Sequence, residues 1–197
     1  MPEKPKKRRY SGQPFEARAA ERRAKLVLAA LQVAGREGFE GASVAAICAE
    51  AGLTARYFYE SFPTREAIFV EAYRLAQDRL LGSMAAAKAK ASRHARDPTR
   101  AALRGFFGAL CEHPGIARVF LIDLDDAGGA MRIASFEGAR KLAKALGLKA
   151  KHPLMLAGIV GAIVDIGKRW IESDFAEPVE KVIEIALPFA RLRDKDG

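Results

Sequence analysis

Apolar residues recur at helical spacing along most of the chain, and no segment shows the apolar–polar alternation that is typical of a half-buried strand. Leu26, Ala30 and Val33, for example, fall on one face of a helix. Segments that contain Gly or Pro, such as residues 113–115 and 151–153, separate the helical stretches. The sequence therefore predicts an all-α fold, and its apolar content of 50% is sufficient for a buried core.

The net charge of +9 favours an anionic partner, either nucleic acid or a lipid surface. The longest apolar stretch, residues 153–166, contains Asp165 and is shorter than the roughly 20 residues that span a bilayer, so we expect a buried helix and no membrane partner. The N-terminus lacks the apolar core of a secretory signal. Because Cys48 and Cys111 have no neighbour at metal-ligand spacing, we expect a cytoplasmic protein without a metal, cofactor or disulfide.

The N-terminal third predicts three short helices. The first ends near Gly38, Ser43 caps the second, Gly52 supplies a tight turn, and Thr54 caps the third. This is the pattern of a helix-turn-helix over residues 43–62, in which the second helix of the pair enters the major groove of DNA.

These signals divide the chain into three parts. Residues 1–14 are rich in Lys, Arg, Pro and Gly and predict a flexible basic arm. Residues 15–66 form the predicted helix-turn-helix DNA-binding domain. Residues 67–197 form a predicted helical domain, connected to the first domain by a long helix that begins near Thr64.

The order and spacing of several motifs are specific. They are Ser43-Val44 through Ile47, Ala51-Gly52-Leu53-Thr54, Tyr57-Phe58-Tyr59, Phe62 and Thr64-Arg65-Glu66-Ala67-Ile68. Over residues 21–73 this pattern resembles the TetR family of bacterial regulators. The resemblance implies a homodimer whose recognition helices read successive major grooves of a palindromic operator. Such regulators usually repress transcription until a small molecule binds the C-terminal domain.

The resemblance also assigns roles to residues of the third helix. Thr54 and Tyr59 match phosphate-contacting positions, which set register, whereas Ala55, Arg56 and Tyr57 match base-contacting positions. Arg56, commonly Gly in the family, is suited to guanine because its fork pairs with O6 and N7. The predicted DNA-binding residues are Lys6, Lys7, Arg8, Arg9, Ser43, Thr54, Ala55, Arg56, Tyr57, Tyr59, Thr64 and Arg65, of which Arg65 replaces the family's common Lys. The alternative for the arm residues is a solubilising tail.

The C-terminal half is generic in sequence, and the resemblance implies that residues 67–197 form the effector-binding and dimerisation domain. An apolar or amphipathic effector is expected, with Arg118, Asp123 or Arg132 as polar anchors, although an ordinary bundle core explains the same aromatic residues. The predicted pocket residues are Phe106, Phe107, Phe120, Leu121, Leu124, Phe136 and Trp170. The predicted dimer residues are Ala157, Gly158, Gly161, Ala162, Val182, Ile185 and Phe189, where packing within one chain is the alternative.

Two other classes of function are alternatives to a regulator. Cys111, His113 and Asp123 suggest a nucleophile, a base and an orienting acid, but closeness along a helical sequence does not establish catalytic geometry, so no enzyme is predicted. The second alternative is a DNA-bound architectural or protein-interaction factor on the same fold, without a small-molecule effector. A filled C-terminal core would favour this factor.

Overall fold

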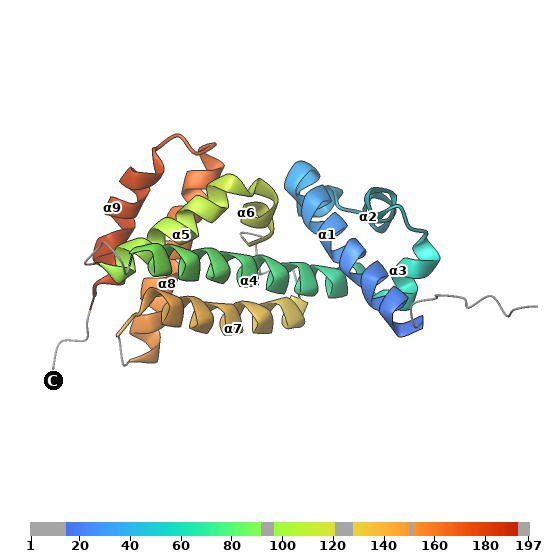
Figure 1. The fold of residues 1–197 in the computed structure, drawn as a ribbon, viewed down its shortest axis with the longest axis horizontal. Coiled ribbons are helices and arrows are strands. Elements are labelled where there is room, and N and C mark those ends of the chain that lie inside the picture. The colour runs from blue at the N-terminus through green and yellow to red at the C-terminus, as the bar shows by residue number, and fades with distance from the viewer. Residues whose placement is uncertain (1–14, 92–96, 121–127, 150–151, 193–197) are drawn as a thin grey trace, which may run out of the picture.

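A computed structural model describes residues 15–91, 97–120, 128–149 and 152–192. These residues form helices and no strand, which confirms the predicted all-α fold. Helices α1 to α3 lie at one end of the molecule, and α4 runs from them along the remaining helices (Figure 1). The described helices are α1 (Phe15–Gly41), α2 (Val44–Ala51), α3 (Ala55–Ser61), α4 (Arg65–Ala91), α5 (Pro98–Glu112), α6 (Pro114–Phe120), α7 (Gly128–Leu146), α8 (Pro153–Glu172) and α9 (Val179–Ala190).

The first helix buries the face that the apolar spacing predicts. Leu26, Ala30 and Val33 are fully buried, and α1 packs against α2 and α3, which contribute the buried Ile47 and Phe58. Gly38 breaks the helical geometry, with φ +76° and ψ 176°, and one further turn reaches Gly41. The predicted end at Gly38 is therefore a break inside a slightly longer helix, because glycine adopts this backbone conformation without a side-chain clash.

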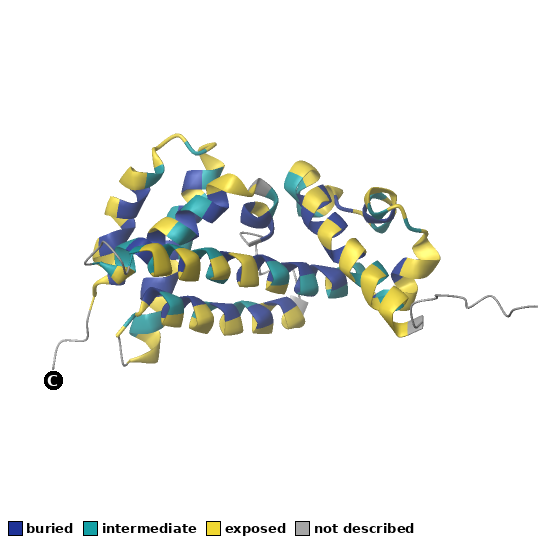
Figure 2. Cartoon of the chain, in the orientation of Figure 1, coloured by how far each residue is buried: buried dark blue, intermediate teal, exposed yellow. Residues whose placement is uncertain are grey.

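One continuous hydrophobic cluster extends from the N-terminal helices into the C-terminal bundle, as the buried stripe along α4 shows (Figure 2). α4 begins at the predicted connection and buries residues on both sides of it, from Ile68 to Met84. It packs against α1 and α6 near its start and against α5 and α7 along its length. The close approach of α5 depends on Gly105, since a Cβ there would lie 2.6 Å from the Cα of Met84.

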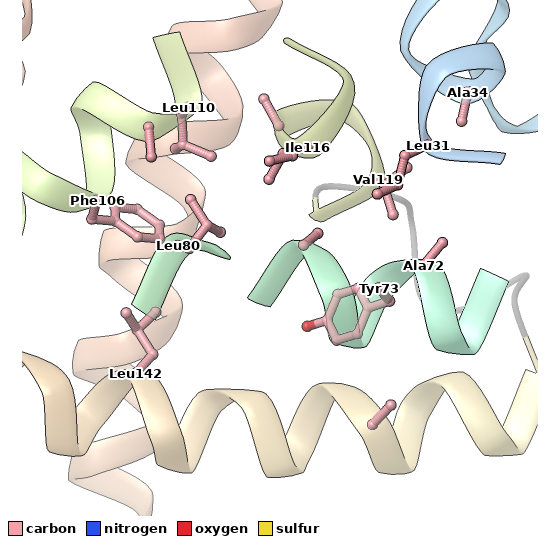
Figure 3. Packing of buried hydrophobic residues seen from close by; sticks show 14 of the residues in the cluster. Leu31, Ala34, Ala72, Tyr73, Leu80, Phe106, Leu110, Ile116, Val119 and Leu142 are labelled. Carbon is pink, nitrogen blue, oxygen red and sulfur yellow. The ribbon is translucent and has the colours of Figure 1, made fainter. Parts of the chain in front are cut away.

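Helix α6 fills the space between α1 and α4. Leu31 of α1, Ile116 and Val119 of α6 and Ala72 of α4 lie in this region (Figure 3). All four are buried, so the N-terminal helices and the bundle share well-packed apolar contacts rather than a solvated hinge. A movement of α6 would therefore shift the side chains of α1 that pack against it.

Ion pairs join α5 to α9 on the opposite side of the bundle. Arg104 donates to Glu180 through Nε and Nη2 at 2.8 and 2.7 Å, and Arg100 pairs with Glu184 one turn further along. The buried helix predicted over residues 153–166 is confirmed as part of α8, and α9 follows it. Pro188 lies inside the last turn of α9, and the helix ends two residues later at Ala190.

Candidate nucleic-acid interface

The helix-turn-helix has the local geometry that the sequence predicts. Ser43 caps α2, since its Oγ accepts a hydrogen bond from the backbone N–H of Ala46 at 3.2 Å. Gly52 ends α2 in the left-handed region with φ +63°, and its N–H reaches the carbonyl oxygen of Ala49 at 3.2 Å. This turn sends the chain directly into α3, whose Phe58 is fully buried. The opposite face of α3 is thereby left outside the core.

Thr54 differs from its expected role as a capping residue. It occupies the N-cap position of α3 with an extended backbone, but its side chain makes no capping hydrogen bond. Thr54 is exposed, and its hydroxyl is not used to cap the helix. Its predicted contact with a DNA phosphate therefore stays a prediction.

The exposed face of α3 carries the residues that were predicted to contact DNA. Ala55 and Arg56 are exposed, and the two tyrosines, Tyr57 and Tyr59, are 37% and 61% exposed. The side chain of Arg56 is 84% exposed, and its Nε donates to Oε1 of Glu60 at 3.0 Å. Sequence reasoning did not include Glu60, although the i to i+4 spacing from Arg56 was a signal for this pair.

Arg22 is a second residue that the sequence analysis did not assign to this interface. Its guanidinium carbon lies 4.6 Å from the centroid of the Tyr57 ring. Its neighbour Arg23 lies 4.0 Å over the Phe62 ring and donates to the carbonyl oxygen of Ser61. These cation–π contacts attach the start of α1 to both ends of the recognition helix and add positive charge beside it.

The two residues at the start of α4 are held within the domain. The Thr64 Oγ1 accepts from the N–H of Ala67 at 3.2 Å, which caps α4. The Arg65 guanidinium carbon lies 4.4 Å from the ring centroid of Phe39 and 5.8 Å from that of Phe69. Arg65 thus packs on aromatic rings, a structural role that was not predicted beside its expected phosphate contact. The arm residues Lys6, Lys7, Arg8 and Arg9 lie outside the described residues.

Three of the predicted pocket residues come together in the bundle. The rings of Phe106 and Phe107 have centroids 5.2 Å apart, and Phe107 lies 5.9 Å from Trp170. All three are buried. The prediction that Phe136 lines the pocket is wrong, because Phe136 is 69% exposed on α7 and does not line an interior pocket of this chain. The Phe120 side chain, Leu121 and Leu124 lie outside the described residues.

Two of the three expected polar anchors lie on the surface of the protein. Arg118 and Arg132 are exposed, and Arg118 donates to the carbonyl oxygen of Arg36 at 3.4 Å. Asp123 lies outside the described residues. The described core instead contains Gln77, which is 4% exposed and was not predicted. A cavity of about 10 Å³ touches Gln77 and Phe106, together with Leu80, Leu81, Gly138 and Leu142.

A small polar group surrounds Gln77. Its Nε2 lies 3.5 Å from the carbonyl oxygen of Ala134, and the Tyr73 hydroxyl hydrogen-bonds with the side chains of Ser135 and Gln77. Burial raises the pKa of Tyr73, so its hydroxyl stays protonated at neutral pH. This group offers hydrogen bonds inside an otherwise apolar core.

The predicted dimer residues divide into two groups. Ala157, Gly158 and Gly161 are exposed along α8, while Ala162 is half-buried. On α9, Ile185 and Phe189 are 45% and 39% exposed. Two apolar residues that were not predicted are also exposed, Leu154 on α8 by 77% and Leu192 after α9 by 46%. The prediction that Val182 lies in the dimer interface is wrong, because Val182 is 2% exposed and packs inside its own chain.

The residues considered for a catalytic function do not form a described site. Cys111 and His113 are exposed at the C-terminal end of α5, and Asp123 lies outside the described residues. Cys48 is buried, and this burial raises the pKa of its thiol.

Among the described residues, no helix has both the length and the apolar content needed to cross a lipid bilayer.

Residues 26–72 match the sequence model of the family described as bacterial regulatory proteins, tetR family. This segment contains the helix-turn-helix with the flanking parts of α1 and α4. No curated protein sequence matches the chain significantly.

The whole fold is similar to several solved structures. One is the multidrug binding protein EbrR complexed with imidazole, with 22% identity, a TM-score of 0.67, and coverage of 87% of this chain and 96% of that chain. FadR from Bacillus subtilis in complex with stearoyl-CoA has 16% identity, a TM-score of 0.67, and coverage of 85% and 96%. A TetR family member from Streptomyces coelicolor A3 has 21% identity, a TM-score of 0.68, and coverage of 87% and 99%.

Proposed function

We propose that the chain is a TetR family regulator that binds a palindromic operator as a homodimer, because residues 26–72 match the family model and contain the helix-turn-helix. In this proposal it represses transcription in the cytoplasm until a small apolar or amphipathic ligand releases it. The observation that carries sequence-specific binding is the exposed face of α3. Arg56 and Tyr57 project from a helix whose other face is anchored by the buried Phe58. A rigidly held helix with an exposed Arg is the element that reads base edges in the major groove.

The α8–α9 face supports the homodimer. It exposes small residues on α8 beside apolar residues on α9, including Gly158, Gly161, Ile185 and Phe189. Small residues let a second helix approach closely, and exposed apolar side chains gain free energy when a partner covers them. A dimer through this face would present two copies of α3 to successive major grooves, about 34 Å apart.

The bundle core supports an apolar effector with one hydrogen-bonding group. The aromatic residues Phe106, Phe107 and Trp170 supply apolar surface, and Gln77 supplies a buried amide. EbrR and FadR were solved with ligands of different sizes, malachite green and stearoyl-CoA. Binding must favour a dimer whose recognition helices no longer match the groove spacing, because a ligand shifts an equilibrium only through its differential affinity for the two states.

One observation favours the second candidate, an architectural or protein-interaction factor without an effector. The cavity beside Phe106 measures about 10 Å³, which is room for about one water molecule at most. An effector that binds beside Phe106 therefore requires the core around Gln77 to open. If the core does not open, the same DNA-binding domain serves a factor that is regulated by partners instead of ligands.

The experiment that tests the regulator is genomic-fragment selection with purified protein at physiological salt. The enriched site and a scrambled control are then compared by affinity, with Arg56→Ala as a matched variant. Enrichment of a palindrome supports a sequence-specific dimer, and the genes beside it direct a ligand screen scored by release of the operator. Uniform, strongly salt-dependent binding would instead identify a DNA-coating protein and contradict the proposal.

A further inference from the structure

We propose that Glu60 is a positioning residue for base recognition: it holds the Arg56 guanidinium by Nε so that both terminal nitrogens face one guanine. This inference rests on the proposed function, since it concerns how the recognition helix reads its operator. The two residues lie one turn apart on α3, with the Arg56 Nε to Glu60 Oε1 distance at 3.0 Å.

The nitrogen that Glu60 uses decides what is left for DNA. A guanine presents O6 and N7 to the major groove, and an Arg fork matches them with two parallel N–H groups. Glu60 binds Nε alone. Within the described part of the chain, Nη1 and Nη2 of Arg56 have no other partner, and the side chain is 84% exposed. The two terminal nitrogens therefore form the free end of a side chain that is already oriented.

The negative charge of Glu60 affects DNA binding, because the exposed face of α3 is expected to lie close to the phosphates of the DNA backbone. A carboxylate on the exposed face of α3 repels the DNA backbone and so weakens binding to every sequence. It also removes some of the rotational freedom of Arg56 before DNA arrives, which favours binding where a guanine fits. Both effects raise the ratio of specific to non-specific affinity. Weakening the wrong complexes is a recognised route to specificity.

Stability of α3 is an inadequate explanation for the pair. Ion pairs at this spacing on an exposed helix contribute little, and the Glu60 side chain is itself 42% exposed. α3 is instead fixed by the buried rings of Phe58 and Phe62. The helix should remain folded when Glu60 is replaced.

The test compares base preferences of the wild type with those of Glu60→Ala, Glu60→Gln and Arg56→Ala, using the selected operator and single-base changes of it. Arg56→Ala identifies the guanine that Arg56 reads. Glu60→Ala should lower the preference for that guanine on the order of fivefold, a fraction of the discrimination of one bidentate pair. It should also raise affinity for unrelated DNA. Glu60→Gln, which keeps the acceptor and loses the charge, should restore part of the guanine preference while still binding unrelated DNA more tightly.

A matched control is Glu50→Ala on α2, which removes another exposed ion pair, that with Arg36 at 2.7 Å. It changes the domain charge equally and should leave the guanine preference unchanged.

Four results would overturn the inference. The first is an equal loss of affinity for all sequences in Glu60→Ala with a lowered melting temperature, which indicates a structural role. The second is the loss of a cytosine preference elsewhere, which indicates a direct contact from Glu60. In the third, the wild type selects a palindrome that Glu60→Ala reads with the same preference, so the inference alone fails. In the fourth, the wild type selects no site, and both the inference and the proposed function fail.

Discussion

Gly35 on α1 packs against Gly115 on α6 through backbone atoms alone. A Cβ at Gly35 would lie 2.6 Å from the Cα of Gly115, and a Cβ at Gly115 would lie 2.9 Å from the carbonyl oxygen of Leu31. Real Cβ atoms do not approach so closely, so the two glycines set the distance between the helix that supports the DNA-binding domain and the short helix of the bundle.

Replacing Gly35 by Ala should therefore force α1 and α6 apart. Overpacking of this kind costs about 1–3 kcal/mol in the free energy of unfolding. Gly82→Ala on α4 is the matched control, because nothing lies within 4 Å of a Cβ there. Both variants gain helix propensity of about 1 kcal/mol, so the difference between them in urea unfolding isolates the clash. Equal stability of the two variants would show that α6 moves away freely.

Asp97 joins the start of α5 to the end of α9, and its ionised form is favoured in the folded protein. Burial raises its pKa, but hydrogen bonds from the Arg100 backbone N–H and from Arg191, the latter at 2.5 Å, outweigh burial and hold the pKa below its usual range. A lowered folded-state pKa contributes stability above the unfolded carboxyl pKa, and this contribution is lost as the pH falls through the folded value.

We expect Asp97→Ala to lower the free energy of unfolding at pH 7 by about 1 kcal/mol through the lost helix cap. Asp97→Asn keeps a capping side chain and should lose less. Both variants should show a smaller decrease in stability than the wild type between neutral pH and pH 3, measured by urea unfolding. A pH profile identical to that of the wild type would mean that Asp97 does not contribute.

The sequence predicted the helices well because their signals are local. The cap at Ser43, the left-handed turn at Gly52 and the buried face of α1 each depend on a few neighbouring residues. The exposure of Phe136 and the burial of Val182 depend on which helix packs beside them, and a single-helix pattern does not contain that information. The same reason explains why Gln77 and Arg22 were not recognised, since their partners lie on other helices.

A charge on α9 should dissociate the proposed homodimer without unfolding the chain. Ile185 is 45% exposed, so Ile185→Glu leaves the carboxylate in water in the monomer but buries it in a dimer through this face. Sedimentation equilibrium should show monomers at concentrations where the wild type is dimeric. Ile133→Glu is the control, since Ile133 is 61% exposed on α7. Dissociation by Ile133→Glu alone would place the interface on α7.

Arg65 combines packing with a predicted phosphate contact, and two variants separate these roles. Arg65→Met keeps an unbranched chain against Phe39 and Phe69, whereas Arg65→Ala removes it. Loss of the stacking contacts in Arg65→Ala should lower the free energy of unfolding by about 1 kcal/mol. Both variants should bind all DNA sequences more weakly and reduce the salt dependence of binding, as loss of a phosphate contact requires. Unchanged salt dependence would assign Arg65 to packing alone.

Gln77 and Gly138 should behave as a coupled pair in the bundle core. A Cβ at Gly138 would lie 1.4 Å from the Nε2 of Gln77, so the amide occupies the space that the glycine leaves open. Gly138→Ala alone should lower the free energy of unfolding by about 1–3 kcal/mol, since the buried amide must move. Gln77→Ala alone leaves a cavity in the core. In the double variant, the methyl group added by Gly138→Ala partly fills this cavity.

The double variant should therefore be more stable than the sum of the two single changes indicates, with a coupling of about 0.5–3 kcal/mol for residues in direct contact. Chemical denaturation of all four proteins measures this cycle. Purely additive effects would mean that Gln77 already leaves its position beside Gly138 in solution. In that case the core around the cavity opens without a ligand, and the room that an effector needs is present before it binds.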